Sequence, residues 1–171
     1  TQKLYVNRKE GFVGTGLRKE EFVGECSDID DVIVFLRNGK YYITKVSTKS
    51  FIGKDIIHVA VFKRNDKRTV YNLVYRDGPK GNYMVKRFFV MGVTRDKEYD
   101  VTKGEKGSKI IYFTSNPNGE AEVIKIYLKQ KARLRNLQFE FDFSSINIKG
   151  RVSIGNILSR HDIDRIKMVE K

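Results

Sequence analysis

Short runs rich in Val, Ile, Tyr and Phe recur along the chain in pairs, and each pair surrounds a glycine turn. The clearest pair joins residues 31–36 to residues 41–46 through a turn that contains Asn38 and Gly39. An Asn-Gly step supplies the positive φ angles that a tight hairpin turn requires. Apolar residues at the helical i, i+3, i+4 spacing form no stripe of useful length, so the pattern predicts an all-β chain.

The hairpin pattern repeats twice more at a nearly constant spacing. The second copy spans residues 71–88 around Gly78, and the third spans residues 110–126 around Gly119. The turn glycines Gly39, Gly78 and Gly119 lie 39 and 41 positions apart. A period of about 40 residues built from strands predicts a propeller-like or solenoid array with one sheet per repeat.

Two less regular copies flank these three, at residues 4–13 and at residues 137–143 with Gly150. A chain of 171 residues is long enough for one domain or for a short repeat array with a shared core. We therefore predict a single propeller-like domain over residues 1–171, with about four blades in a closed or an open ring.

Basic residues outnumber acidic ones by 34 to 21, which gives a formal net charge of +13. The excess is uneven, because residues 1–31 hold five basic and seven acidic residues, whereas residues 32–171 hold 29 and 14. Such a surface attracts polyanions, and the binding weakens with salt because Lys and Arg release counterions from phosphates. A solvated basic surface without a ligand is the alternative, while the lack of a basic amphipathic helix disfavours anionic lipid.

The composition favours a folded chain in a reducing compartment. Hydrophobic residues make up 40% of the chain, enough to offset the entropy of ordering it. The longest apolar runs span four or five residues, far short of the roughly 20 that a membrane helix needs. The single Cys26 cannot form an internal disulfide, so we expect a cytoplasmic location. The chain begins at Thr1 with no signal-like stretch, and we expect it to be a piece of a longer polypeptide.

Basic residues return at one position of the repeat, after the second strand of each hairpin. Residues 45–54, residues 86–104 and residues 149–156 each combine Lys or Arg with Gly at this position. Repeats arranged in a ring would place these residues on one rim, as a band of positive charge.

A fixed order of residues in the first full repeat carries a resemblance to a known family. Residues 31–35 are followed by the Asn38-Gly39 turn, then by Thr44-Lys45-Val46 and Ile52-Gly53-Lys54. The resemblance covers essentially the whole chain and is strongest over residues 28–160. This order resembles a blade of the C-terminal domain of bacterial type IIA topoisomerase A subunits, which belong to DNA gyrase and topoisomerase IV. The resemblance implies a β-pinwheel, whose four-stranded blades exchange strands and whose basic outer rim binds and bends duplex DNA.

In that family the domain assists strand passage without performing the cleavage. The resemblance implies that this chain by itself is not an enzyme, that none of its nine tyrosines is catalytic, and that it holds no cofactor or metal. The ATP and Mg²⁺ of the full isomerase would be bound elsewhere. The implied partners are duplex DNA, the breakage-reunion domain of the same polypeptide and the ATPase B subunit. The piece itself is expected to be monomeric and nucleoid-associated.

Two features depart from the family pattern. The gyrase-defining Gln-Arg-Arg-Gly-Gly-Lys-Gly run is absent, and the nearest basic-glycine stretch is Lys149-Gly150-Arg151. The resemblance therefore implies decatenation and relaxation of the topoisomerase IV kind rather than tight chiral wrapping. About four repeats are also fewer than the five or six blades common in the family.

Bending a duplex over a convex surface needs many phosphate contacts rather than base recognition, which suits flexible Lys and forked Arg. Between Lys125 and Arg135 there are five basic residues and no acid. For each candidate, an ordinary solvated charge is the competing interpretation. The predicted DNA-binding residues are Lys45, Lys49, Lys54, Lys86, Arg87, Lys103, Lys125, Lys129, Arg133, Arg135 and Arg151.

Metal sites are discounted. Asp28, Asp30 and Asp31 precede a strand without a calcium-loop pattern, so turn capping is the better interpretation. His58 and His161 lie far apart and match no metal-binding spacing.

Two other functions stay open from the sequence. A protein-interaction propeller would use the basic rim to bind an acidic partner. A single-strand or RNA-binding β-protein would need aromatic platforms on an exposed sheet face. A catalytic function is disfavoured, because no nucleophile, base and orienting group can be assembled.

Overall fold

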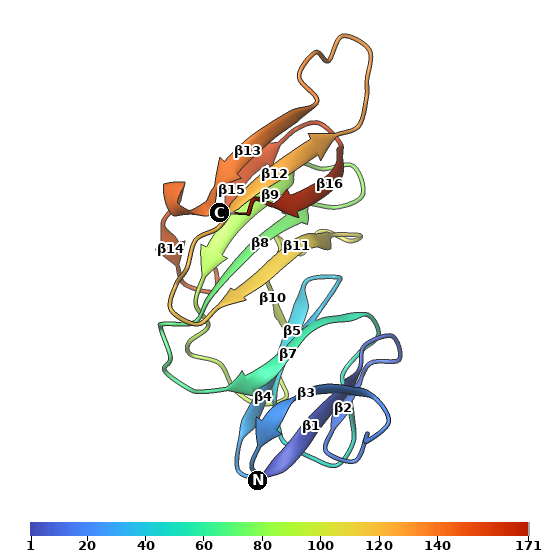
Figure 1. Cartoon of the computed structure of the whole chain (residues 1–171), viewed down its shortest axis with the longest axis vertical. Coiled ribbons are helices and arrows are strands. Elements are labelled where there is room, and N and C mark those ends of the chain that lie inside the picture. The colour runs from blue at the N-terminus through green and yellow to red at the C-terminus, as the bar shows by residue number, and fades with distance from the viewer. Residues whose placement is uncertain (171) are drawn as a thin grey trace. The chain divides into compact units, whose positions relative to one another are not determined.

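The structure is a computed structural model that describes residues 1–170. It contains sixteen strands in four sheets and one short 3-10 helix, η1 (Phe143–Ser145), and no α-helix occurs among the described residues (Figure 1). The prediction of an all-β chain is therefore confirmed. No helix in this part of the chain is long and apolar enough to cross a membrane.

The strands divide over two compact units, each with two sheets and its own hydrophobic core. Unit 1 comprises Thr1–Asn65 and Gly92–Val101, and unit 2 comprises Asp66–Met91 and the chain from Thr102 onward. The sequence prediction treated the whole chain as one domain.

Unit 1 holds sheets A and B. Sheet A has the strand order β3-β1-β2-β6 and sheet B the order β10-β5-β4-β7. The strands of sheet A are β1 (Gln2–Asn7), β2 (Phe12–Gly14), β3 (Glu21–Cys26) and β6 (Ser50–Phe51). Those of sheet B are β4 (Asp31–Leu36), β5 (Lys40–Lys45), β7 (Ile56–Phe62) and β10 (Tyr99–Asp100).

Unit 2 holds sheets C and D. Sheet C has the order β11-β8-β9-β14 with β15 also paired to β9, and sheet D has the order β13-β12-β16. The strands of sheet C are β8 (Val70–Arg76), β9 (Tyr83–Phe88), β11 (Lys109–Asn116), β14 (Ile148–Lys149) and β15 (Asn156–Ser159). Those of sheet D are β12 (Val123–Leu128), β13 (Gln138–Asp142) and β16 (Ile163–Met168).

One construction rule produces all four sheets. Two consecutive strands form an antiparallel hairpin, and a later strand of the same repeat returns to pair with the first of them. The returning strands are β3, β7, β11 and β16. In three sheets further strands, here called exchange strands, come from the following repeat: β6 joins sheet A, β10 joins sheet B, and β14 and β15 join sheet C. The strand exchange that the resemblance implied is thus present in sheets A, B and C.

The exchange strands β6 and β10 are anchored by equivalent backbone hydrogen bonds. The Ile52 N–H, next to β6, donates to the Gly11 carbonyl at 2.8 Å, and the Val101 N–H, next to β10, donates to the Gly39 carbonyl at 3.0 Å. Gly11 and Gly39 both have positive φ and occupy the hairpin turns of sheets A and B. Each of these two exchange strands therefore ends its pairing on the turn glycine of the preceding repeat.

Aromatic pairs strengthen the same two junctions. Phe51 of β6 lies opposite Phe12 of β2, with ring centroids 5.3 Å apart. Tyr99 of β10 lies opposite Tyr41 of β5, with ring centroids 5.4 Å apart. Cross-strand aromatic pairs add to the stability of a sheet, which helps strands of only two residues to stay paired.

One predicted hairpin does not form. The hairpins within residues 4–13, 31–46 and 71–88 are present, but the expected pair within residues 110–126 is split, because β11 pairs with β8 whereas β12 pairs with β13 and β16. The turn at Gly119 therefore carries the chain from sheet C to sheet D. An Asn-Gly turn has the same sequence signature in either role, so the sequence could not separate the two.

The alternation along each strand decides which side chains enter the core. In unit 1, Val32, Val34 and Leu36 of β4 pack with residues of β1 and β7. In unit 2, Ile124 and Ile126 of β12 pack with residues of β8, β9 and η1. The intervening residues of β12 point to the opposite face of sheet D, because side chains alternate along a strand.

The docking of β6 predicts a large effect for Gly11→Ala. A Cβ at position 11 would lie 2.1 Å from the Gly53 carbonyl oxygen, and Gly11 has a φ of +89°. We expect a loss of about 2–3 kcal/mol in the free energy of unfolding, measured by urea denaturation. Gly24→Ala is the control, because a Cβ at position 24 of β3 meets nothing within 4 Å. Equal effects of the two changes would contradict this account of the junction.

His58 of β7 predicts a pH dependence of stability. Burial, followed by the charge of Arg8, lowers the pKa of His58 from 6.5 to about 4. The folded state therefore keeps this side chain neutral while the unfolded chain takes up a proton below pH 6.5. The contribution to stability is present above pH 6.5 and is lost as the pH falls toward 4, by about 3 kcal/mol at most.

The measurement is the free energy of unfolding between pH 4 and pH 7 for the wild type and for His58→Leu. The carboxylates contribute equally to both proteins, so the wild-type curve should fall more steeply with decreasing pH. Parallel curves would show that His58 is not kept neutral by the fold.

Candidate nucleic-acid interface

The three predicted residues of unit 1 lie at the end of β5 and around β6. Lys45, Lys49 and Lys54 are all exposed. The ammonium of Lys49 lies 4.6 Å from the centre of the Phe12 ring. The connecting loop is held close to the chain after β2, since the Thr15 N–H donates to the Ser47 carbonyl at 3.0 Å. Lys45 lies opposite Asp31 at the start of β4, whereas Gly53, next to Lys54, lies against Leu36 at the end of that strand. The three charges therefore do not share one edge of unit 1.

The largest group of predicted residues lies on and after β12. Lys125 points from β12, whereas Lys129, Arg133 and Arg135 belong to the loop of residues 129–137 that joins β12 to β13. This loop, called here the basic loop, also contains Lys131, and all four of its basic side chains are exposed. It has no acidic residue, so its charge is not neutralised from within.

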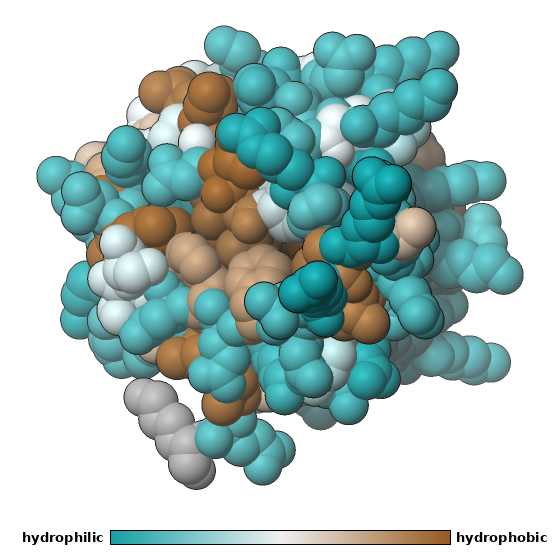
Figure 2. All heavy atoms as spheres, turned by 90° about the horizontal axis from the view of Figure 1, so that it is seen from above, coloured by the Kyte–Doolittle hydropathy of each residue, from teal (hydrophilic) through white to brown (hydrophobic). Residues whose placement is uncertain are grey.

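The basic loop is tied down at its base. The Leu128 N–H donates to the Leu137 carbonyl and the Lys129 N–H donates to the Asp162 carbonyl, both at 2.8 Å. Beyond these bonds the loop extends past the strands of sheet D (Figure 1). From the end at which it lies, the visible surface is largely hydrophilic, with hydrophobic residues gathered toward the middle (Figure 2).

Two further predicted residues of unit 2 are only partly available. The ammonium of Lys103 lies 3.5 Å from a carboxylate oxygen of Asp77. Arg151 is half-buried and donates its Nε–H to the Met91 carbonyl at 3.0 Å. Both side chains already have protein partners, so fewer of their N–H donors are available to a phosphate.

Lys86 and Arg87 are corrections to the prediction. Both are buried, with exposed fractions of 2% and 6%. Lys86 donates from Nζ to the Ser153 carbonyl and lies over the Phe88 ring. All six residues of β9 are buried, because this strand is covered on both faces. A short strand that contains both apolar and basic residues does not reveal that second cover in its sequence, so these two residues were wrongly placed on the surface.

Arg87 is part of a buried polar network. Its Nε–H donates to Asn72 Oδ1 and its Nη2 donates to the Gly119 carbonyl, both at 2.9 Å. Asn72 in turn donates to the Glu122 carboxylate, which also accepts from Tyr112 at 2.9 Å. Burial, together with the bond to Glu122, raises the pKa of Tyr112. This network joins sheet C to the segment that enters sheet D.

The sequence pattern did not reveal a paired-arginine site in unit 1. Asp31 lies 3.2 Å from Nε of Arg64 and 2.6 Å from Nε of Arg95. The Asp31 side chain is 8% exposed and both arginine side chains are 45% exposed. Arg64 also donates to the Val93 carbonyl at 2.9 Å. An acid at the start of a fully apolar strand was the available signal, because a buried carboxylate requires cationic partners.

Turn capping is correct for Asp30, whose carboxylate accepts from the Ser27 N–H at 2.8 Å. Among residues 1–170 no group of three or more His, Cys, Asp or Glu side chains could hold a metal ion.

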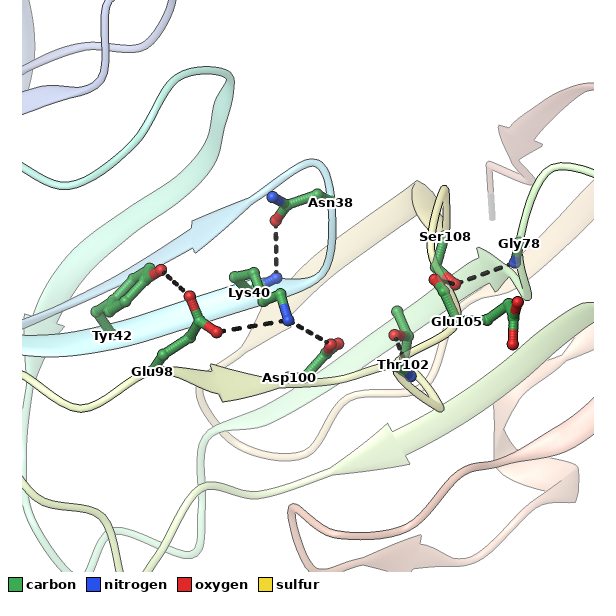
Figure 3. Close-up of polar contacts among 10 residues, drawn as sticks. Asn38, Lys40, Tyr42, Gly78, Glu98, Asp100, Thr102, Glu105 and Ser108 are labelled. Carbon is green, nitrogen blue, oxygen red and sulfur yellow. Dashed lines mark hydrogen bonds and ion pairs between the residues drawn. The ribbon is translucent and has the colours of Figure 1, made fainter.

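Two acids in and just before the exchange strand β10 neutralise the charge of Lys40. The ammonium of Lys40 lies 3.1 Å from Asp100 and 3.5 Å from Glu98, and Tyr42 donates to Glu98 at 2.7 Å (Figure 3). The hydrogen bond with Asp100 raises the pKa of Lys40, and burial raises the pKa of Tyr42 to about 12. Lys40 therefore serves the sheet rather than a ligand.

The buried role of Arg87 predicts the effect of Arg87→Met. This change leaves Asn72 Oδ1 and the Gly119 carbonyl without their donor, so we expect a loss of about 3 kcal/mol in the free energy of unfolding. Arg135→Met removes the same charge from the exposed basic loop and should change stability by less than about 0.5 kcal/mol. Similar losses in urea denaturation for both variants would contradict the assignment of Arg87 to the core.

Comparison with known proteins gives one family and one curated relative. The family model described as "Topoisomerase C-terminal domain, Bacteroidota" matches residues 3–170. The chain is also 28% identical over 166 residues to the A subunit of DNA topoisomerase 4 from Borreliella burgdorferi. That alignment covers 96% of this chain and 25% of the relative. The chain thus spans about a quarter of the length of that relative.

Proposed function

Because the chain belongs to the topoisomerase C-terminal domain family, we propose that it binds duplex DNA without sequence preference and bends it along a basic surface. The bent duplex would then be presented to the strand-passage machinery of a type II topoisomerase. The proposal assigns this chain to positioning DNA, and assigns cleavage and ATP hydrolysis to other parts of the enzyme.

The observation that carries the proposal is the exposed, unneutralised charge of the basic loop. Four cations stand within residues 129–137, with no acid among them, and their side chains are exposed. Contacts of this kind are directed at phosphates and carry no sequence information. Lys45, Lys49 and Lys54 are three further exposed cations in unit 1.

The relative favours a topoisomerase IV-like enzyme over a gyrase, since it is named as part of a DNA topoisomerase 4 and the gyrase-defining run is absent from this chain. The proposed partners are duplex DNA, the breakage-reunion domain of the same polypeptide and an ATPase B subunit. ATP and Mg²⁺ would act on those parts. A cytoplasmic, nucleoid-associated location follows from these partners.

The test is binding to linear duplexes of increasing length, with salt titration and energy transfer between dyes at the two duplex ends. We expect affinity to rise with length, the ends to approach each other, and log K to fall with log salt. The four loop cations alone should contribute about 3.6 to the magnitude of that slope, at roughly 0.9 each.

A matched pair of charge variants locates the interface. Changing the four basic-loop cations to Gln should remove most of the slope that they contribute. The control changes four exposed cations of the acidic first segment to Gln, namely Lys3, Lys9, Arg18 and Lys19. If the wild-type chain does not bind duplex DNA at low salt but does bind an acidic protein, the DNA-binding proposal is wrong. The alternative of a protein-interaction propeller with an acidic partner would then be supported.

A further inference from the structure

Sheet D has an outer face that gathers cations from two strands. Ile124 and Ile126 of β12 are buried in the core, so Lys125 and Tyr127 point to the other face. The register of β12 and β16 sets Lys125 opposite Lys167 and Tyr127 opposite Arg165. These four residues are called here the sheet D cation face.

Two like charges stand directly opposite each other on this face. A Lys125–Lys167 cross-strand pair disfavours the sheet unless an anion lies between or above the two ammonium groups. On the other side, Lys125 lies opposite Glu140 of β13, yet no ion pair joins any cation of this face to an acid within residues 1–170. None of the three cations on the face is therefore held in an ion pair by an acid of this part of the chain, although Glu140 opposite Lys125 offsets part of the positive charge.

Tyr127 fixes the direction of two of these cations. The Arg165 guanidinium carbon lies 4.3 Å from the centre of the Tyr127 ring, and the Lys125 ammonium lies 5.4 Å from it. Cation–π contacts of this kind hold long side chains along the sheet. Side chains that are already ordered lose less entropy when they bind a ligand. Arg165 and Lys167 are exposed, so their donors still face solvent.

The row of charge continues beyond the face. β12 ends at Leu128 and the basic loop begins at Lys129, so the cations of the face lead along one strand into those of the loop. A row of this length exceeds what a single carboxylate or phosphate group needs, and it fits an extended anion with regularly repeated charges.

We propose that the sheet D cation face is a phosphodiester-binding site, in which Arg165 and Lys167 contact the backbone of duplex DNA and Tyr127 is a positioning residue for Arg165 and Lys125. The proposal rests on the function proposed above and extends it to residues that the repeat pattern did not single out. It assigns the duplex a path from the basic loop onto the outer face of sheet D.

The first test removes the charges. In the whole chain, Arg165→Gln with Lys167→Gln should lower the slope of log K against log salt by about 1.8, at roughly 0.9 per phosphate contact. The matched control is Lys80→Gln with Lys106→Gln, two exposed cations in turns of unit 2. The control loses the same charge and should change the slope by less than about 0.5. Equal changes in the two double variants would overturn the site, because they would reflect net charge alone.

The second test leaves the charge unchanged. Tyr127→Leu should weaken duplex binding about threefold to fivefold, since it removes the ring that orders Arg165. Tyr127→Phe keeps the ring and should restore binding to within about twofold of the wild type. Thermal unfolding identifies a variant that merely fails to fold. Wild-type binding by a folded Tyr127→Leu variant would overturn the positioning role.

The outcomes separate this site from the general function. If the wild type binds duplex and the Arg165/Lys167 variant binds equally well with the same slope, the site is wrong and the DNA-binding function stands. If the wild type binds no duplex, both fail. If the variant loses binding to poly-glutamate but keeps binding to duplex, the face serves an acidic protein partner and the phosphodiester assignment is overturned.

Discussion

The backbone hydrogen bonds that join β6 and β10 to the hairpin turns of sheets A and B are the constraint on which the other features depend. β6 and β10 have only two residues each. Their pairing therefore depends on the hydrogen bonds that the Ile52 and Val101 N–H groups donate to the Gly11 and Gly39 carbonyls. A side chain at Gly11 would strike the Gly53 carbonyl. The repeats therefore depend on their neighbours for a complete sheet, as expected of arrays whose units cannot be stable alone.

The fold also divides the basic residues into those that are paired with an acid and those that are not. Asp100 of β10 forms an ion pair with Lys40, and Asp31 forms ion pairs with Arg64 and Arg95. These cations hold strands and segments in place. No cation of the basic loop or of the sheet D cation face forms an ion pair with an acid among the described residues, so these cations remain available at the surface. The net charge of +13 cannot distinguish these two classes, because the difference lies in which acid the fold brings to each cation.

The sequence was sufficient to predict those strands and hairpins that depend on local residue patterns. The hairpin of β4 and β5 follows from alternating apolar residues and an Asn-Gly turn, and the structure confirms it. The Gly119 turn carries the same signal but joins two sheets, because strand pairing is decided by tertiary contacts. Exchange strands of two residues are too short to show any periodicity. The pairing of Arg165 with Tyr127 depends on the register between β12 and β16, which no local pattern contains.

Lys86 and Lys125 show why the placement of a strand, rather than its residue pattern, determines the use of a charge. Both lie in strands that mix basic and apolar residues, and both were predicted to contact DNA. β9 is covered on both faces, so Lys86 must find its hydrogen bonds inside the protein. β12 is covered on one face only. Ile124 and Ile126 point into the core, so Lys125 and Tyr127 remain at the surface. A basic strand can offer its charges to a ligand only where one of its faces has no layer above it, and β12 and β16 of sheet D both meet that condition.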